Sequence, residues 1–193
     1  FSSCAAYGAC FQEIGSDGAF SNFESQLAFS DIYHPLYIPE GMYGWAKVLG
    51  EVLCSQLPGG FKTTVLRPFG GYGTDQSLSY PFPAIVDRIK RSENPVVIWG
   101  SGRQVRDWIH VKDVCRLAFE AHRKNNGNLT INLGTGSGIN FLELARKIMQ
   151  LSGKSLDLLP DTSKPEGVAY RVADTLNMNR VGLFPSISLD QGI

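Results

Sequence analysis

Short runs rich in β-branched residues alternate along this chain with segments of helical periodicity, and this alternation limits the fold more than any other feature. The clearest helix is predicted over 41–56, where apolar residues recur every three or four positions before a Pro-Gly-Gly stop. Further elements are helices over 82–91, 112–124 and 140–150, and strands over 62–67, 95–99, 108–111 and 129–133. A turn is predicted over 68–73, after the first of these strands. Strands that alternate with helices predict an α/β fold with a mainly parallel sheet.

One long segment does not follow this alternation. Between Ala9 and Glu40 there is no clear period, and glycine and proline interrupt the segment repeatedly. We expect a long loop there, and loops of that length are usually functional or mobile.

Composition and charge exclude several classes of protein. The chain has 193 residues and is 43% hydrophobic, which is enough for one domain or somewhat more. Its 18 basic and 18 acidic side chains cancel, so we expect no nucleic-acid partner and no membrane partner. No apolar run approaches the ~18 residues that a spanning helix needs. The four cysteines form no Cys-x-x-Cys pair, so we expect reduced thiols in the cytoplasm and no metal site.

Tyr43 and Lys47 are the side chains with the clearest chemical potential. They stand four positions apart in the predicted helix, so they leave the same face about one turn apart. Tyrosine, with a pKa of about 10, is a poor base at neutral pH, but a nearby ammonium stabilises the phenolate. Lowering that pKa by about 3 units takes roughly 4 kcal/mol. Alone the pattern is weak evidence, because both residues are common on solvated helix faces.

Other blocks surround this pair in a fixed order. They are Ser3 ahead of a Tyr-Gly turn, Arg-Pro-Phe-Gly-Gly-Tyr-Gly over 67–73, Trp-Gly-Ser-Gly-Arg-Gln-Val-Arg-Asp-Trp-Ile-His-Val-Lys-Asp over 99–113, Asn-Leu-Gly-Thr-Gly over 132–136 and Pro-Ser-Ile-Ser-Leu-Asp-Gln-Gly over 185–192. Together with Tyr43 and Lys47, these blocks resemble the extended short-chain dehydrogenase/reductase family, in particular its NAD-dependent nucleotide-sugar epimerases and dehydratases.

The resemblance implies the C-terminal part of a Rossmann-like parallel sheet and a smaller α/β substrate-binding domain. It assigns residues 1–75 to the remainder of the NAD(P)-binding Rossmann domain, and 76–193 mainly to nucleotide-sugar binding, with part of the chain returning to the Rossmann sheet. The sequence contains no Gly-x-x-Gly-x-x-Gly or Gly-x-Gly-x-x-Gly turn, which in that family holds the pyrophosphate of NAD(P). We therefore expect the chain to be a fragment that lacks the N-terminal nucleotide-binding half.

The resemblance also implies roles for the residues near the N-terminus. Tyr43 is the acid/base that exchanges a proton with a sugar hydroxyl, and Lys47 lowers its pKa and holds the nicotinamide ribose. Ser3 hydrogen-bonds the same sugar oxygen, with Ser2 as the alternative if the register differs by one. A strand-end hydroxyl that is satisfied locally is the other interpretation of Ser3. Pro68–Phe69 fall where the family's backbone meets the carboxamide of NAD or NADP.

Four further residues are candidates for substrate binding by the same resemblance. Gly70 stands where relatives often carry Asn. Trp99 ends a strand that lines the nucleobase pocket in relatives, although core packing is an equal interpretation. Arg106 matches an arginine used against the sugar-nucleotide diphosphate, with a surface ion pair as the alternative. Lys164 falls where some epimerases place a second diphosphate arginine.

The reaction is narrowed by the residues after Ser3. Dehydratases of the family carry acidic residues there, whereas this chain has Cys4 and Ala5. Reductase-epimerases of the GDP-fucose-synthase type carry a cysteine where Ala5 stands, one position beyond Cys4. A simple epimerase needs only Ser, Tyr, Lys and the cofactor, so we favour NAD(P)-dependent epimerisation of a nucleoside-diphosphate sugar. Dehydratase and reductase activity remain alternatives, as does a non-catalytic chain or a half-enzyme that needs a partner.

The predicted helix over 41–56 is apolar over more than one stripe. One stripe can pack on the sheet, and the remainder is best buried against another subunit; the residues concerned are Met42, Trp45, Leu49, Val52 and Leu53. In the resembling family this helix forms a dimer interface, and we expect a homodimer.

Overall fold

The computed structural model describes residues 1–7, 39 and 41–193. The loop predicted over 9–40 lies outside these residues, apart from Pro39.

Strands β1 (Thr63–Pro68) and β5 (Asn128–Leu133) pair in parallel. They form the centre of the first of two spatial halves of the molecule, which combines early and late segments of the sequence. Leu66 lies opposite Ile131 in this register. The amide of Ser2 donates to the carbonyl of Leu66 (2.8 Å), so the start of the chain lies beside β1. A single 3-10 turn, η1 (Cys4–Ala6), follows at once.

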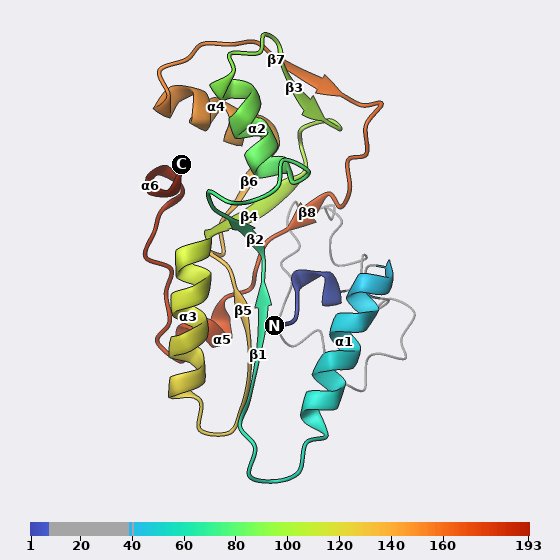
Figure 1. Cartoon of the computed structure of the whole chain (residues 1–193), viewed down its shortest axis with the longest axis vertical. Coiled ribbons are helices and arrows are strands. Elements are labelled where there is room, and N and C mark those ends of the chain that lie inside the picture. The colour runs from blue at the N-terminus through green and yellow to red at the C-terminus, as the bar shows by residue number, and fades with distance from the viewer. Residues whose placement is uncertain (8–38, 40) are drawn as a thin grey trace.

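Helices lie on both sides of the β1–β5 pair (Figure 1). On one side is α1 (Gly41–Ser55), and on the other are α3 (Val111–Lys124) and α5 (Leu176–Arg180). An apolar cluster fills the space between the strands and α3 and α5; its buried members include Leu66, Leu117, Ile131, Leu133 and Met178.

The second half is organised around β4 (Val105–His110). This strand runs parallel to β2 (Gly70–Tyr72) and β8 (Tyr170–Arg171), and antiparallel to β6 (Gly138–Asn140). A separate parallel pair joins β3 (Val96–Trp99) to β7 (Leu158–Asp161). The accompanying helices are α2 (Pro81–Lys90), α4 (Phe141–Leu151) and α6 (Leu189–Gly192).

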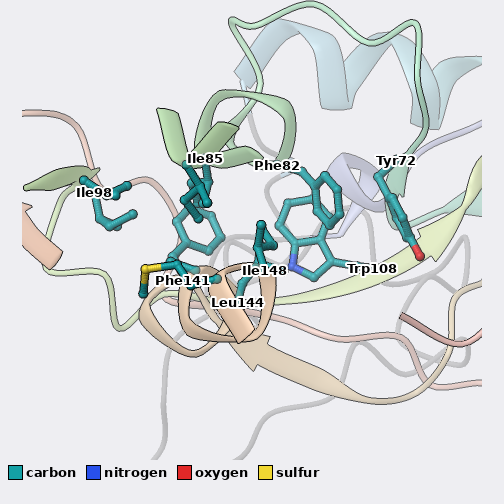
Figure 2. Packing of buried hydrophobic residues seen from close by; sticks show 12 residues of the cluster. Tyr72, Phe82, Ile85, Ile98, Trp108, Phe141, Leu144 and Ile148 are labelled. Atoms are coloured by element: carbon teal, nitrogen blue, oxygen red, sulfur yellow. The ribbon is translucent and has the colours of Figure 1, made fainter. Parts of the chain in front are cut away.

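Four aromatic rings lie among aliphatic side chains in the core of this second half (Figure 2). Tyr72 stacks on Phe82 with ring centroids 4.3 Å apart, and Phe82 meets the edge of Trp108 at 5.2 Å. Phe141, at the start of α4, lies 6.0 Å beyond Trp108. Such offset contacts add to the large apolar area that each ring buries. The core therefore fixes α2, β4 and α4 against one another.

The predicted α/β class is confirmed, and the predicted helices lie within one residue of the observed ones at most ends. The start of α4 carries a capping box, in which Asn140 and Glu143 bond each other's backbone amides. The prediction was wrong over 70–72, where a turn was expected and β2 is present. A Cβ at Gly70 would stand 2.5 Å from the carbonyl oxygen of Asp107, so glycine here permits close strand pairing.

No helix in the part of the chain that the structure describes is long and apolar enough to cross a bilayer. The same residues hold no group of three or more His, Cys, Asp or Glu that could bind a metal ion.

Candidate active site

Gly44 marks the closest approach between α1 and η1. It is buried, and a Cβ at this position would overlap the carbonyl oxygen of Ala5 and stand 2.9 Å from Cβ of Pro39. Gly44 lies between Tyr43 and Lys47 in the sequence. Its missing side chain therefore lets the helix bring both residues close to the start of the chain.

Tyr43 and Lys47 lie on the same face of α1, as their spacing predicts. The Tyr43 side chain is 60% exposed, and Nζ of Lys47 lies 5.2 Å from the centre of its ring. The same Nζ donates to the carbonyl of Phe1 (3.3 Å). A phenol open to solvent thus has a fixed positive charge beside it.

The two serines have different surroundings. Oγ of Ser3 accepts the amide of Ala5 (3.2 Å) and caps η1, 3.9 Å from Sγ of Cys4. Ser2 is buried, and its hydroxyl donates to the carboxylate of Glu51. Ser3 is the more exposed of the pair, so it is the better placed to meet a ligand.

Glu51, which is partly buried, and Arg67, which is buried, form an ion pair that the sequence analysis did not single out. The carboxylate accepts from Nε (3.0 Å) and Nη2 (2.7 Å) of Arg67, whose side chain is only 2% exposed. Burial alone would lower the pKa of Arg67, but the hydrogen bonds and charges of Glu51 and Tyr7 outweigh it and raise that pKa. Two signals were available. Glu51 continues the four-residue spacing of Tyr43 and Lys47, and Arg67 is a charge inside an otherwise buried strand.

At the end of β1, residues 68–70 offer a ligand backbone groups rather than side chains. Phe69 is buried, and its amide donates to the carbonyl of Leu133 (2.9 Å). Pro68 has no amide hydrogen, so only carbonyl oxygens of this pair could meet a carboxamide. Gly70 packs against Asp107 and Trp108 and leaves no room for a side chain that could contact a substrate.

Trp99 and Arg106 line one cavity of about 100 Å³, between α2, the end of β3 and the start of α4. Trp99 is 48% exposed, and Cζ of Arg88 lies 5.9 Å from the centre of one of its rings. Glu166 forms part of the opposite wall, where its carboxylate accepts from the amide (3.2 Å) and hydroxyl (2.5 Å) of Ser101. An aromatic face and a guanidinium therefore share this hollow.

Lys164 is not brought into the cavity with them. It is exposed, its amide bonds the carbonyl of Asp161 (3.1 Å), and it precedes Pro165, which does line the cavity. Arg171 of β8, which sequence reasoning missed, lies directly opposite Arg106 in the pairing with β4. Only the strand register, which the sequence does not reveal, puts these two arginines side by side.

The residues around Tyr43 fit the nicotinamide end of a bound NAD(P). An ammonium has three hydrogens to donate, and one hydrogen bond of Lys47, to Phe1, is found among the described residues. The remaining hydrogens suit the ribose hydroxyls of the cofactor, and the exposed phenol of Tyr43 suits a sugar beside it.

Comparison with known proteins places these residues in a family. Residues 1–134 match the model of the NAD dependent epimerase/dehydratase family. The chain is 27% identical over 169 residues to a probable GDP-L-fucose synthase of Oryza sativa subsp. japonica, which covers 82% of the chain and 52% of that protein. It is 29% identical over 170 residues to the GDP-L-fucose synthase of Escherichia coli K12, with 78% and 53% covered. The chain thus spans about half the length of the curated relatives it matches.

Solved structures give the same result for the fold. The UDP-glucuronic acid 4-epimerase of Bacillus cereus, in complex with UDP-glucuronic acid and NAD, superimposes with a TM-score of 0.76 at 26% identity. The superposition covers 99% of this chain and 57% of that one.

Proposed function

Since the chain belongs to the NAD dependent epimerase/dehydratase family, we propose that it catalyses the NAD(P)-dependent epimerisation of a nucleoside-diphosphate sugar. A carbinol carbon of the sugar is oxidised transiently, and the hydride returns to the opposite face. The observation that carries the proposal is the close approach of α1, which bears Tyr43 and Lys47, to η1, which Ser3 caps.

Tyr43 is the proposed acid/base. Its exposed hydroxyl exchanges a proton with the reacting sugar hydroxyl, while Lys47 keeps a positive charge one helical turn away. Lys47 also donates to the ribose of the cofactor, and Ser3 hydrogen-bonds the sugar oxygen. The carbonyl oxygens of Pro68–Phe69 accept from the carboxamide. When bound, NAD(P) supplies the reversible acceptor for the hydride.

The cavity around Trp99 and Arg106 is the proposed nucleotide site. A guanidinium is permanently charged and binds phosphate oxygens in pairs, so Arg106 suits the diphosphate. The exposed ring of Trp99 offers a face on which a nucleobase can stack. Gly70 contributes only backbone, and Lys164 lies outside the cavity at the loop that closes it.

We also propose the domain division suggested by the sequence, with residues 1–75 belonging to the cofactor-binding half and 76–193 mainly to the substrate half. The return of β5 to pair with β1 supports the expected re-entry of the chain into the first sheet. A cytoplasmic location is proposed because Cys4, Cys54 and Cys115 are free thiols.

An epimerase that also reduces its substrate is the second candidate. Two observations favour it: the similarity to GDP-L-fucose synthases, and the buried thiol of Cys4 beside Ser3. The two candidates differ in their demand for cofactor. An epimerase returns the hydride to the sugar and consumes no cofactor, whereas a reductase oxidises one NADPH for each product formed.

The deciding experiment incubates the protein with nucleoside-diphosphate sugars and with 4-keto sugars, with NAD or NADPH, and follows absorbance at the nicotinamide band together with product stereochemistry. Epimerised product without net cofactor turnover supports the first proposal. Stoichiometric loss of NADPH supports the second. Neither product with any sugar would favour a non-catalytic chain.

Replacement of the acid/base tests the assignment of Tyr43. We predict that Tyr43→Phe lowers the turnover rate by about 10²–10⁴-fold, because general acid–base catalysis has that value. Nucleotide-sugar binding, measured by calorimetry, should stay within about twofold, since the cavity is untouched. A variant that keeps more than about a tenth of the rate would contradict the role.

We further propose that the exposed apolar face of α1 joins a second copy of the chain. Met42 is 85% exposed, Leu49 58% and Leu53 61%. Two-fold homodimers are the commonest oligomers, and an apolar face of this kind suits one. Light scattering at micromolar concentration should give a dimer mass that Leu49→Glu reduces to a monomer mass; a monomer before the substitution would contradict the proposal.

A further inference from the structure

We infer that Glu51 and Arg67 are positioning residues, which hold the helix bearing Tyr43 and Lys47 in one register against the start of the chain. The inference rests on the proposed function, because it concerns where the proposed acid/base is held. It adds two residues that neither contact the substrate nor bind the cofactor.

The first observation is a stripe on α1. Tyr43, Lys47 and Glu51 follow one another at four-residue intervals, which places them on one face of the helix. The first residues of the chain run along this stripe in order. The carbonyl of Phe1 accepts from Lys47, and the hydroxyl of Ser2 donates to Glu51. Two successive residues thus contact two successive members of the stripe, so sliding the helix by one turn would break both contacts.

The second observation is the anchor on the sheet. Arg67 belongs to β1, and its Nε and Nη2 donate to the two carboxylate oxygens of Glu51 at 3.0 and 2.7 Å. Its Nη1 also donates to Oη of Tyr7 (3.0 Å), which in turn donates to Oδ1 of Asn132 in β5 (2.9 Å). The network therefore links α1, the segment after Ser3 and both central strands through one buried guanidinium.

The third observation is that few other contacts among the described residues fix α1. Only Gly44 and Val48 are buried in this helix, so apolar packing restrains its position weakly. Buried ion pairs are poor sources of stability compared with apolar side chains of similar volume, but a polar pair has a single satisfied geometry. The pair is therefore better suited to specifying where α1 sits than to strengthening the fold.

The test compares Glu51→Gln with a matched control, Asp113→Asn. Asp113 is a buried carboxylate paired with Arg116, which is 37% exposed, and it anchors the C-terminal segment to α3. In the assay that detects activity, Glu51→Gln should lower kcat by about 10- to 100-fold and leave KM for the nucleotide sugar within about threefold, because a displacement of about 1 Å can cost that much. Asp113→Asn should lower the melting temperature and leave kcat per folded molecule within about twofold.

A second variant separates position from stability, in case Glu51→Gln folds poorly. The double change Glu51→Leu with Arg67→Met fills the same space without charge and should fold with a melting temperature near that of the unmodified protein. We expect its kcat to remain low. We also expect amide exchange of residues 41–55, measured without cofactor or substrate, to stay faster than in the unmodified protein.

Normal kcat and normal exchange in the folded double variant would overturn the inference, as would equal losses in Glu51→Gln and Asp113→Asn. The proposed function fails separately. If Tyr43→Phe retains its rate, Tyr43 is not the acid/base whatever Glu51 does; if Tyr43→Phe is inactive and Glu51→Gln is not, only the positioning role fails.

Discussion

Helices α1 and α4 are attached to the molecule in opposite ways. The 11 residues of α4 bury five side chains, among them Phe141, Leu144 and Ile148, and begin with a capping box. The 15 residues of α1 bury only Gly44 and Val48. Helix α1, which carries the candidate catalytic residues, is thus positioned by polar contacts and by a close backbone approach. Helix α4, which carries none of them, is held by the apolar core.

This difference shows that stability and placement are supplied by different parts of the chain. The two apolar clusters away from α1 can supply most of the free energy of folding, since burial of apolar area is its main source. That leaves one face of α1 for the proposed contacts with ligands and another for the proposed contact with a second copy of the chain. The following predictions test this separation, starting with the largest expected effect.

Shortening a buried side chain of α4 should lower the free energy of unfolding far more than shortening one of α1. We predict that Leu144→Ala lowers the free energy of unfolding by about 2–5 kcal/mol, because a fully buried leucine leaves a cavity. Val48→Ala, the matched change in α1, should cost about 1–2 kcal/mol, since fewer methyl groups leave the interior. Urea titrations of both variants measure the two losses of unfolding free energy. Equal losses would contradict the proposed difference between α1 and α4.

Closing the gap between α1 and η1 should displace the helix. Gly44→Ala places a Cβ against the carbonyl of Ala5, and we expect a loss of about 1–3 kcal/mol from overpacking. Gly50→Ala is the control on the same helix, because a Cβ there has nothing within 4 Å. It should stabilise the protein by about 0.5–1 kcal/mol through helix propensity. Stabilisation by both changes would show that the close approach does not constrain α1.

The polar anchor of α3, Asp113, should respond to pH, whereas the apolar anchor of α4 should not. Burial alone would raise its pKa, but hydrogen bonds from Arg116, Ile187 and Ser186 together hold that pKa below its usual value. A depressed pKa means that the ionised form favours the fold. The contribution is therefore complete above the usual aspartate value of about 3.9 and is lost as pH falls through the lower folded value.

The measurement is the difference in unfolding free energy between the unmodified protein and Asp113→Asn from pH 7 down to pH 2. The difference should shrink toward the acid end. Comparing the two proteins is necessary because burial raises the pKa of Asp107, which acts in the opposite direction. A difference that stays constant with pH would show that Asp113 does not titrate with unfolding.

Local patterns in the sequence were sufficient for most of the architecture. Apolar spacing located α1 and the Asn140 cap located α4, because both signals lie within a few residues of the element they describe. Local patterns also explain why β2 was not predicted, because two adjacent glycines indicate a turn. These glycines form a strand only because β4, with Trp108, lies beside them in the folded protein.

The candidate site likewise contains residues that local spacing predicted and residues that it did not. The spacing of Tyr43 and Lys47 was enough to place both on one helix face. Nothing local connects Glu51 with Arg67, because that pair depends on how α1 packs against β1. Nothing local connects Arg106 with Arg171 either, because that pair depends on which strand lies beside β4. Partners that meet only after the chain has folded leave no periodic trace in the sequence.

The pairing of β1 with β5 has a consequence for the protein during its synthesis. Leu66 pairs with Ile131, 65 positions later. A ribosome adding about 5–20 residues per second needs about 3–13 s for that stretch, whereas strands that are near each other pair in microseconds. Throughout this interval one edge of β1 has no strand beside it, and nascent chains on neighbouring ribosomes could pair with it. A charge within a strand discourages such pairing, so we expect Arg67 to limit association between growing chains until β5 is made.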